Sequence, residues 1–406
     1  MKILLVSQYF YPENFRLNDF AFKLASKGHE VTVLTGIPNY PNGKAFGAFK
    51  ILRKDSIKGV TVYRVPMMLR GNSRGIELIL NYISFLVSAV IFGPILLLRE
   101  RFDIVFATNY SPATVGIVGA FFAALKGTPL FLWVQDLWPD TLTALNATKS
   151  NFALTLVELM IRWIYRRSDR ILIQSRAFKS SVESRGIHAN KIEYFPNWAE
   201  DLYTDTICDL ELKNTMKIPQ NKFIIMFAGN LGECQSLDTI VNAAKILQDS
   251  PIHWVLLGDG REKSNIEKKI IKSDLTTNIS LLGHYPVEDM PRFFAQADVM
   301  LVTLRSEPVF SLTIPGKVQS YLKSGKPILA GLNGEGASIV SESGAGIAVP
   351  ADDPVGLAEA ALQLSSLNSG ELKNMGTLGK KYYDENFDVD MLINRFEHLV
   401  CTKNGP

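Results

Sequence analysis

The stretch from Arg305 to Lys317 carries residue types that suit the binding of an anion. It follows an apolar run typical of a strand, is rich in small and hydroxylated residues, and leads into a predicted helix with a proline at its start. Proline fits the first turn because no amide donor is lost there. The free amides of that turn carry a partial positive charge. We expect Ser311, Thr313 and the Lys317 ammonium to converge with them on one anion; the alternative is a plain helix cap with a solvated lysine.

Two other loops follow predicted strands and are candidates for ligand contacts. Gly258, in a Gly-Asp-Gly turn, would let the backbone approach a ligand, although a tight strand-to-helix turn needs the same residues. Asp136 follows a buried strand, and open α/β sheets bind ligands beyond the carboxyl ends of their strands. We expect Asp136 or Asp140 to orient a substrate hydroxyl; the alternative is a capping aspartate and a packed Trp138. The loop after the first strand adds Asn14 and Arg16.

The elements that must position these residues follow from the apolar pattern. Lys2–Val6 is a continuous apolar run, typical of a strand buried on both faces. A loop, an amphipathic helix near Leu17–Lys27 and a second strand, Val31–Thr35, complete a β-loop-α-β unit, which implies a parallel sheet with a right-handed crossover. The pattern restarts at Phe223–Ala228. We therefore predict two α/β lobes of similar size, with a boundary at Phe195–Trp198.

Composition narrows the classes of function. The 406 residues have a net charge of +3 and no long basic block, whereas a nucleic-acid binder would normally show a clustered basic face. The three cysteines, Cys208, Cys234 and Cys401, have no paired spacing, which favours a reducing compartment over a thiol-ligated metal. No Gly-x-Gly-x-x-Gly follows the first strand, which argues against a dehydrogenase. The start, MKILLVSQYF, indicates a strand rather than a secretion signal.

One segment, Leu78–Leu98, has 21 residues without a formal charge. Its length alone suits a membrane span, but polar residues and a proline interrupt it, and it lies between strands that must join one sheet. We weigh two main interpretations, a buried crossover helix and a helix on a membrane surface. The basic residues near it in the sequence are Lys50, Arg53, Lys54, Lys58, Arg64, Arg70, Arg74, Arg99 and Arg101.

Ordered strings along the chain resemble the glycosyltransferases of family four, which have the GT-B fold. Three of them resemble WbuB-type N-acetyl-L-fucosamine transferases of bacterial surface polysaccharide synthesis: WVQDLWPDTL, GNLGECQSLD and TIPGKVQSYLKSGKPILAGLNGEGA. Each string alone is a weak signal, but their common order along the chain is specific. The strings that resemble family-four motifs are GHEVTVLT (28–35), DIVFATN (103–109), VQDLWPD (134–140), FPNW (195–198), FAGNLG (227–232), LLGDGRE (256–262), ADVMLV (297–302) and PGKVQSYLKSGKPI (315–328).

This resemblance implies an α/β fold of two Rossmann-like lobes that face each other across a deep cleft. Residues 1–197 would form the acceptor-binding domain and residues 198–385 the nucleotide-sugar-binding domain. Residues 386–406 would form a helix that returns to the N-terminal lobe.

Several positions depart from the family pattern. The family often has a Glu-x7-Glu pair, and here those positions hold Leu312 and Ser320. Ser320 would then contact the donor ribose more weakly than a glutamate. The usual Arg and Lys after the first strand of the second lobe are Asn230 and Gln235. Arg305 and Lys317 would therefore neutralise the departing diphosphate. The resemblance also places the uracil beside His284 and Tyr285.

The resemblance implies a retaining, metal-independent transferase that takes its sugar from a UDP-sugar, with N-acetyl-L-fucosamine as the expected sugar. The acceptor would be a lipid-diphosphate-linked saccharide in O-antigen or capsule synthesis. The enzyme would lie at the cytoplasmic face of the cell membrane, bound peripherally, with no metal, other cofactor or nucleic acid. The alternatives are an inert GT-B subunit that binds a partner transferase and a UDP-sugar 2-epimerase. Binding of UDP would discriminate against the inert subunit.

Overall fold

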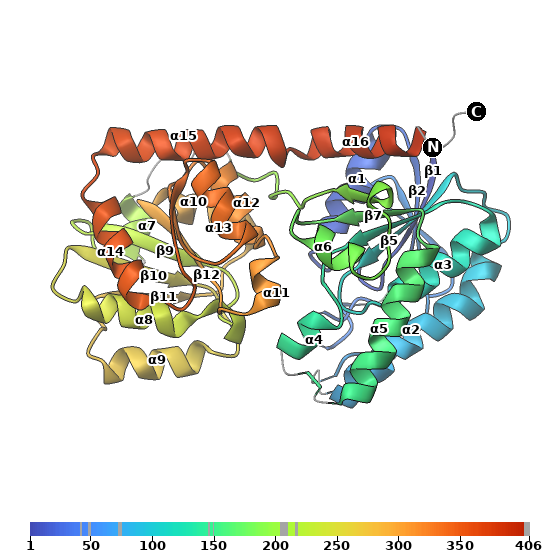
Figure 1. Ribbon diagram of the computed structural model, residues 1–406, viewed down its shortest axis with the longest axis horizontal. Coiled ribbons are helices and arrows are strands. Elements are labelled where there is room, and N and C mark those ends of the chain that lie inside the picture. The colour runs from blue at the N-terminus through green and yellow to red at the C-terminus, as the bar shows by residue number, and fades with distance from the viewer. Residues whose placement is uncertain are drawn as a thin grey trace. The chain divides into compact units, whose positions relative to one another are not determined.

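The computed structural model describes residues 1–40, 43–47, 50–71, 75–144, 147–148, 150–203, 210–215 and 218–401, so Arg74 and Cys208 lie outside the described residues. The chain divides into two compact units, Met1–Pro196 with Val389–Pro406 (unit 1) and Asn197–Asp388 (unit 2). The sequence analysis ended the first domain at residue 197 and the second at residue 385, whereas unit 2 of the structure runs from Asn197 to Asp388. Each unit is an α/β sandwich built on one sheet (Figure 1).

Unit 1 has a sheet in the order β3-β4-β2-β1-β5-β6-β7-β8. All its strand pairs are parallel except β3 with β4. The carboxyl ends of β1, β2 and β5 are therefore neighbours at one edge of the sheet. The strands are β1 (Lys2–Val6), β2 (Glu30–Thr35), β3 (Lys54–Ile57), β4 (Val60–Arg64), β5 (Ile104–Asn109), β6 (Leu130–Val134), β7 (Arg170–Ile173) and β8 (Ile192–Tyr194).

Two helical layers cover this sheet. On one side, α1 packs with α16, and the ring of Phe396 on α16 lies 5.1 Å from Phe20 and 5.6 Å from Phe106. On the other side, α3 packs between α2 and α5 (Figure 1). The helices are α1 (Arg16–Ser26), α2 (Gly75–Leu96), α3 (Val115–Lys126), α4 (Asp140–Ala144), α5 (Asn151–Arg167), α6 (Phe178–Glu183), a 3-10 turn η1 (Ala189–Lys191) and α16 (Val389–Cys401).

Unit 2 has an all-parallel sheet in the order β11-β10-β9-β12-β13-β14. Separate apolar clusters pack on its two faces. Its strands are β9 (Phe223–Ala228), β10 (Ile252–Leu257), β11 (Ile279–Gly283), β12 (Val299–Thr303), β13 (Ile328–Gly331) and β14 (Gly346–Val349). Its helices are α7 (Leu210–Thr215), α8 (Leu237–Ile246), α9 (Lys263–Lys272), α10 (Met290–Ala295), α11 (Pro308–Ser311), α12 (Gly316–Lys323), α13 (Glu335–Glu342), α14 (Pro354–Ser365) and α15 (Ser369–Asn386), with 3-10 turns η2 (Glu233–Gln235) and η3 (Val287–Asp289).

The predicted fold class, two doubly wound α/β units, is confirmed. Of the two interpretations weighed for Leu78–Leu98, the mostly buried crossover helix does not fit the structure. Helix α2 does connect β4 to β5, but only 22% of its most apolar window is buried. Its buried residues are Asn81, Phe85, Ala89 and Gly93, which are four apart and form one narrow stripe. The larger aliphatic side chains point away from the sheet, and α2 is the one helix of the described chain that is long and apolar enough to cross a membrane.

Candidate active site

In unit 2, the loops that follow β9 and β10 meet backbone to backbone. A Cβ built on Gly258 would lie 1.8 Å from the carbonyl oxygen of Gly229, and one on Gly260 would lie 2.4 Å from that of Leu231. Gly258 also has a φ of 149°, which side-chain-bearing residues rarely adopt. Packing alone therefore requires these glycines. The same contact brings the exposed Asn230 beside the Gly258 turn.

Lys317 is the second residue of α12 and reaches this junction. Its ammonium donates to Oε1 of Gln235 at 2.6 Å and lies 4.7 Å from the centre of the Phe227 ring. A Cβ on Gly229 would lie 2.7 Å from the Lys317 Cε. Burial lowers the pKa of Lys317 to about 8, because a poorly hydrated site disfavours the charged form. The structure thus joins Lys317, Gln235 and the Gly229 loop into one cationic site.

Arg305 lines a different part of the same sheet edge, a cavity of about 260 Å³ that does not include Lys317. Its Nη1 donates to Oε1 of Glu233 at 2.9 Å. The cavity is also lined by Asp238, Glu262 and Asp352. These carboxylates would repel a phosphate placed in the cavity. Arg305 is therefore less suited than Lys317 to bind the leaving group.

The hydroxyls near α12 make contacts within their own segments. Ser311 donates to the carbonyl of Pro308 at 2.6 Å, and Thr313 donates to that of Val309 at 3.1 Å. Ser320 is buried, and its hydroxyl lies 3.4 Å from a carboxylate oxygen of Glu200. A carboxylate thus stands close to the position where the family pattern has one, although it comes from the linker after Asn197.

His284 and Tyr285 follow β11, as predicted, but they have different surroundings. His284 is exposed. The Tyr285 ring is half-buried and packs against Phe293 of α10, with 4.6 Å between ring centres. The backbone carbonyl of Gly283 accepts a hydrogen bond from the Gly258 amide at 2.7 Å, so this turn is joined to the glycine junction.

In unit 1, Asp136 lies at the carboxyl end of β6. Its backbone amide donates to the carbonyl of Asn109 at 3.3 Å, and burial raises the pKa of its side chain to about 6. Trp138 is buried, and Asp140 pairs with Arg185 at 3.1 Å. Arg185 also donates to the Trp138 carbonyl. Trp138 and Asp140 therefore have structural partners, whereas Asp136 carries a carboxylate in a poorly hydrated position.

Four aromatic rings gather at the carboxyl ends of β1, β2 and β5, a feature that the motifs did not indicate. Tyr9 stacks on Phe15 at 4.9 Å with 7° between the rings. Phe15 in turn lies 5.3 Å from both Tyr40 and Tyr110. We call these four residues the aromatic cluster. Of the predicted contacts, the exposed Asn14 and the half-buried Arg16 flank Phe15 in the chain.

A buried carboxylate ties the loops of this cluster together. Glu13 accepts hydrogen bonds from the backbone amides of Phe10 at 3.2 Å, Asn39 at 2.8 Å and Tyr40 at 2.7 Å. These bonds favour the charged form, but burial outweighs them and raises the pKa of Glu13 to about 7. The loops after β1 and β2 are thereby held in one arrangement.

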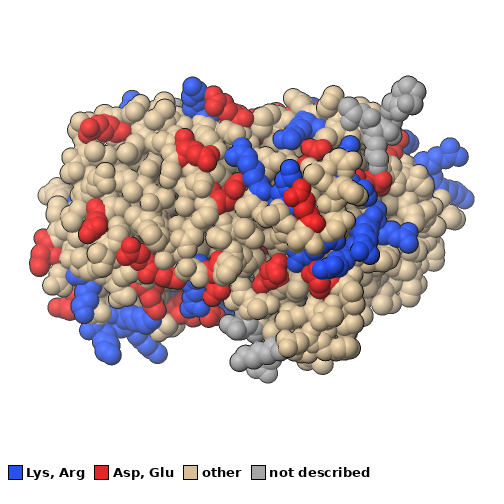
Figure 2. All heavy atoms as spheres, viewed as in Figure 1, with Lys and Arg blue, Asp and Glu red and all other residues tan. Residues whose placement is uncertain are grey.

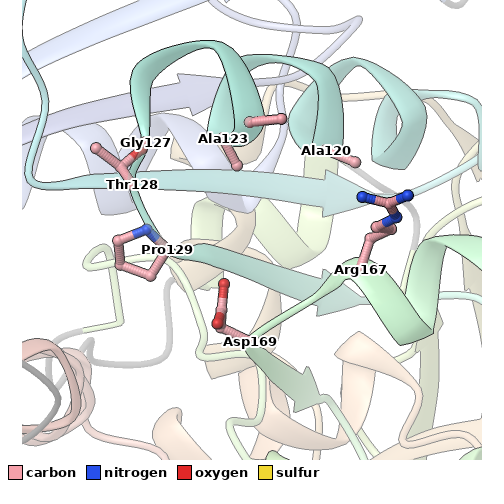
Figure 3. A pocket seen from close by; sticks show the side chains of 8 residues that line it. Ala120, Ala123, Gly127, Thr128, Pro129, Arg167 and Asp169 are labelled. Atoms are coloured by element: carbon pink, nitrogen blue, oxygen red, sulfur yellow. The ribbon is translucent and has the colours of Figure 1, made fainter.

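The hollow between α3 and α5 is not part of this site. It measures about 420 Å³, with alanines of α3 on one side, Asp169 on the other and Arg167 at one end (Figure 3). Pro129 and Asp169 immediately precede β6 and β7, so the hollow lies at the amino ends of these strands. Ligands of open α/β sheets bind at the opposite ends.

Comparison with known families decides the class of protein. A family model described as "Glycosyl transferase 4-like domain" matches residues 14–198, and one described as "Glycosyl transferases group 1" matches residues 222–366. The chain is a glycosyltransferase, since each of its two halves matches one of these models. It is therefore an enzyme of sugar transfer, and the two matches correspond to units 1 and 2.

Individual relatives agree with this family. The chain is 26% identical to the putative colanic acid biosynthesis glycosyl transferase WcaI of Escherichia coli, over 80% of this chain and 82% of the relative. It is 24% identical to the probable glycosyltransferase WbjE of Pseudomonas aeruginosa, over 77% and 78%. The crystal structure of Anabaena HepE in complex with UDP matches with a TM-score of 0.72 at 16% identity, over 99% of this chain and 100% of that one. This last match confirms the GT-B fold.

Proposed function

We propose that this glycosyltransferase takes a sugar from a UDP-sugar and adds it to a lipid-diphosphate-linked saccharide during surface polysaccharide synthesis. The observation that carries the proposal is Lys317, a half-buried cation held beside the glycine loops at the carboxyl edge of unit 2. A cation preorganised in a poorly hydrated site is well suited to a departing diphosphate. Support for the pathway comes from the WcaI relative, whose name places it in colanic acid synthesis, and support for the nucleotide from HepE, which was crystallised with UDP.

The proposal includes four finer features. Lys317 would stabilise the leaving group without a metal ion, with a second contribution from Arg305. The reaction would retain the configuration of the sugar, and the sugar would be N-acetyl-L-fucosamine, both of which rest on the family resemblance. In unit 1, Asp136 would orient a reacting hydroxyl, since it has a carboxylate at the ligand edge of the sheet.

Nucleotide binding tests the donor half directly. We expect UDP to raise the melting temperature of the purified chain, with GDP, TDP and ADP giving smaller shifts and magnesium or EDTA no change. A ligand that binds only the folded state stabilises it by mass action. A shift that requires magnesium would overturn metal independence. The absence of any nucleotide response would overturn the UDP-sugar donor.

Peripheral attachment to the cytoplasmic face of the membrane is supported by the outward face of α2. Ile79, Ile83, Val87 and Ile91 of that face are each 47–55% exposed. A second apolar row on α5 ends in basic residues, and Figure 2 shows an uncharged area over the first half of α5. An apolar face flanked by basic side chains suits an anionic lipid surface. The exposed apolar residues of α5 are Phe152, Leu156, Leu159 and Trp163, and the basic ones are Arg162, Arg166 and Arg167.

Not all of the basic residues predicted near this face are exposed where they could contact a membrane. Arg64 is fully buried and donates to the Tyr11 carbonyl at 2.8 Å, so its expected place on the membrane surface is wrong. Arg99 and Arg101 are exposed just beyond α2.

Sedimentation with phosphatidylglycerol vesicles tests whether the outward face of α2 binds membranes. We expect I83E/V87E to reduce binding about tenfold, while the control I246E/I271E, at exposed isoleucines of unit 2, has no effect. If both variants sediment with the vesicles to the same extent, the proposed membrane attachment through α2 is overturned.

A further inference from the structure

Arg70 lies where the aromatic cluster meets the apolar surface of α2, and its guanidinium is already oriented. It lies 4.9 Å from the centre of the Tyr40 ring, and its Nη1 donates to the Tyr9 hydroxyl at 2.7 Å. Its backbone amide donates to Oδ1 of Asn39 at 3.0 Å. These contacts connect Arg70 to the loops after β1 and β2. The side chain is therefore held in place rather than extended into solvent.

The guanidinium retains unused hydrogen-bonding capacity. Its Nε is buried and has no hydrogen-bond partner among the described residues. An unmade hydrogen bond at a buried donor is unfavourable, and more so for a charged group. Glu13 interacts with the charge of Arg70, but its carboxylate oxygens accept hydrogen bonds from three backbone amides. The guanidinium is thus oriented by one hydrogen bond to the Tyr9 hydroxyl and forms no ion pair with a carboxylate of the described residues.

An apolar strip begins directly beside Arg70. Met68 is 51% exposed and Leu69 is 40% exposed. Met68 is joined to the first half of α2, because its amide donates to the Ser84 hydroxyl at 2.9 Å and its carbonyl accepts from Asn81. The outward side chains of that half of α2 are Ile76, Ile79, Leu80 and Ile83, all exposed.

We propose that Arg70 binds the diphosphate of a polyprenyl-diphosphate-linked acceptor. The lipid would lie along Met68, Leu69 and α2, and the saccharide would lie against the aromatic cluster. Guanidinium is the side chain that matches phosphate in geometry and charge, through two parallel hydrogen bonds. Aromatic faces suit the apolar side of sugar rings. Tyr40 is 39% exposed, so it has surface left for such a contact. This assignment rests on the proposed function and names the acceptor subsite within unit 1.

Farnesyl diphosphate tests the subsite, since it carries the lipid and diphosphate but no sugar. Its binding to the full chain is measured by calorimetry with UDP at saturation, so that the donor site is filled; farnesol is the matched ligand without charge. We expect R70Q to weaken farnesyl diphosphate binding about ten- to hundredfold and to leave farnesol unchanged. R70K should retain part of the affinity, because it keeps the charge and loses the fork. The control R99Q removes an exposed arginine beyond the other end of α2 and should change neither ligand.

Other outcomes would overturn the assignment. Equal loss of both ligands in R70Q, with a lowered melting temperature, would mean that Arg70 only holds the loops together. Loss of phosphatidylglycerol-vesicle binding in R70Q but not in R99Q, with farnesyl diphosphate binding intact, would assign Arg70 to lipid headgroups. Failure of the proposed function gives a different pattern, in which wild type shows no stabilisation by UDP while R70Q still weakens farnesyl diphosphate binding and leaves farnesol binding unchanged.

Discussion

The carboxyl edges of the two sheets are built from contrasting residues. In unit 2, backbone contacts between Gly229 and Gly258 form a tight junction, and one lysine supplies the charge. In unit 1, aromatic rings such as Tyr9 and Phe15 stack on one another, and a buried Glu13 fixes the loops. Both edges occupy the same place in the same kind of sheet.

Under the proposed function, this difference would let one architecture serve two substrate chemistries. Small residues allow a charged ligand to approach the backbone, where amides and a cation stabilise it. Aromatic faces offer area and little charge, which suits sugar rings and lipid chains. We therefore assign the leaving group to unit 2 and the acceptor to unit 1. The predictions below test this division from the larger expected effects to the smaller.

The largest effect should come from Lys317→Ala in unit 2. Removal of a cation opposite the leaving group should lower kcat about 10²- to 10³-fold and reduce the UDP-induced rise in melting temperature. Lys323→Ala is the matched control on the same helix, since Lys323 pairs with Asp201 at 2.9 Å. Unchanged turnover of Lys317→Ala would remove the lysine from the mechanism.

In unit 1, Asp136→Asn should lower transfer about 10²-fold, the size of a lost acid–base or orienting contact, without affecting UDP binding. The pKa of Asp136 is raised to about 6, so its carboxylate is charged above that pH. Wild-type kcat/KM should therefore fall as the pH drops below 6, and the variant should lose this limb of the profile. A variant that also loses the UDP response would show that the two edges are not separable.

The strands buried on both faces could be predicted from the sequence almost completely. Continuous apolar runs predicted β1 and β9 with the bounds that the structure has. Strands β3 and β4 escaped prediction, because β3 contains Lys54 and Asp55 at an exposed edge and pairs antiparallel. Apolar periodicity also could not tell which side of α2 faces the sheet. Its buried stripe consists of Asn81, Phe85 and smaller residues, the reverse of the usual pattern.

The site was predictable where it depends on local sequence. The proline-led entry to α12 indicated Lys317, but not its contact with Gln235, which lies 82 residues away. The ion pairs of Arg305 and Asp140 are likewise contacts between distant segments. The aromatic cluster comes from three loops that follow different strands, so no spacing in the sequence indicates it.

A smaller effect should appear in the pH dependence of UDP binding. Lys317 has its pKa lowered to about 8, so the free enzyme carries the ammonium below that pH and loses it above. A bound diphosphate favours the charged form, and UDP affinity should fall by about tenfold per pH unit above 8. Calorimetry between pH 7 and 10 should also detect proton uptake on binding near pH 8.5. Lys317→Ala should abolish both signals; their persistence would assign the titration to another group.

The smallest effect should come from the exposed ring of unit 1. Tyr40→Ala should raise KM for the lipid-linked acceptor about fivefold, since an aromatic contact contributes about 1 kcal/mol, with kcat and UDP binding unchanged. Tyr40→Phe keeps the face and should match wild type. Tyr11→Ala is the control, because Tyr11 is 40% exposed and lies against Phe22 rather than in the cluster. If Tyr11→Ala and Tyr40→Ala raise KM equally, the contribution is general surface area and not the cluster. An effect of Tyr40→Ala on UDP affinity instead would place donor chemistry in unit 1 and end the division between the two edges.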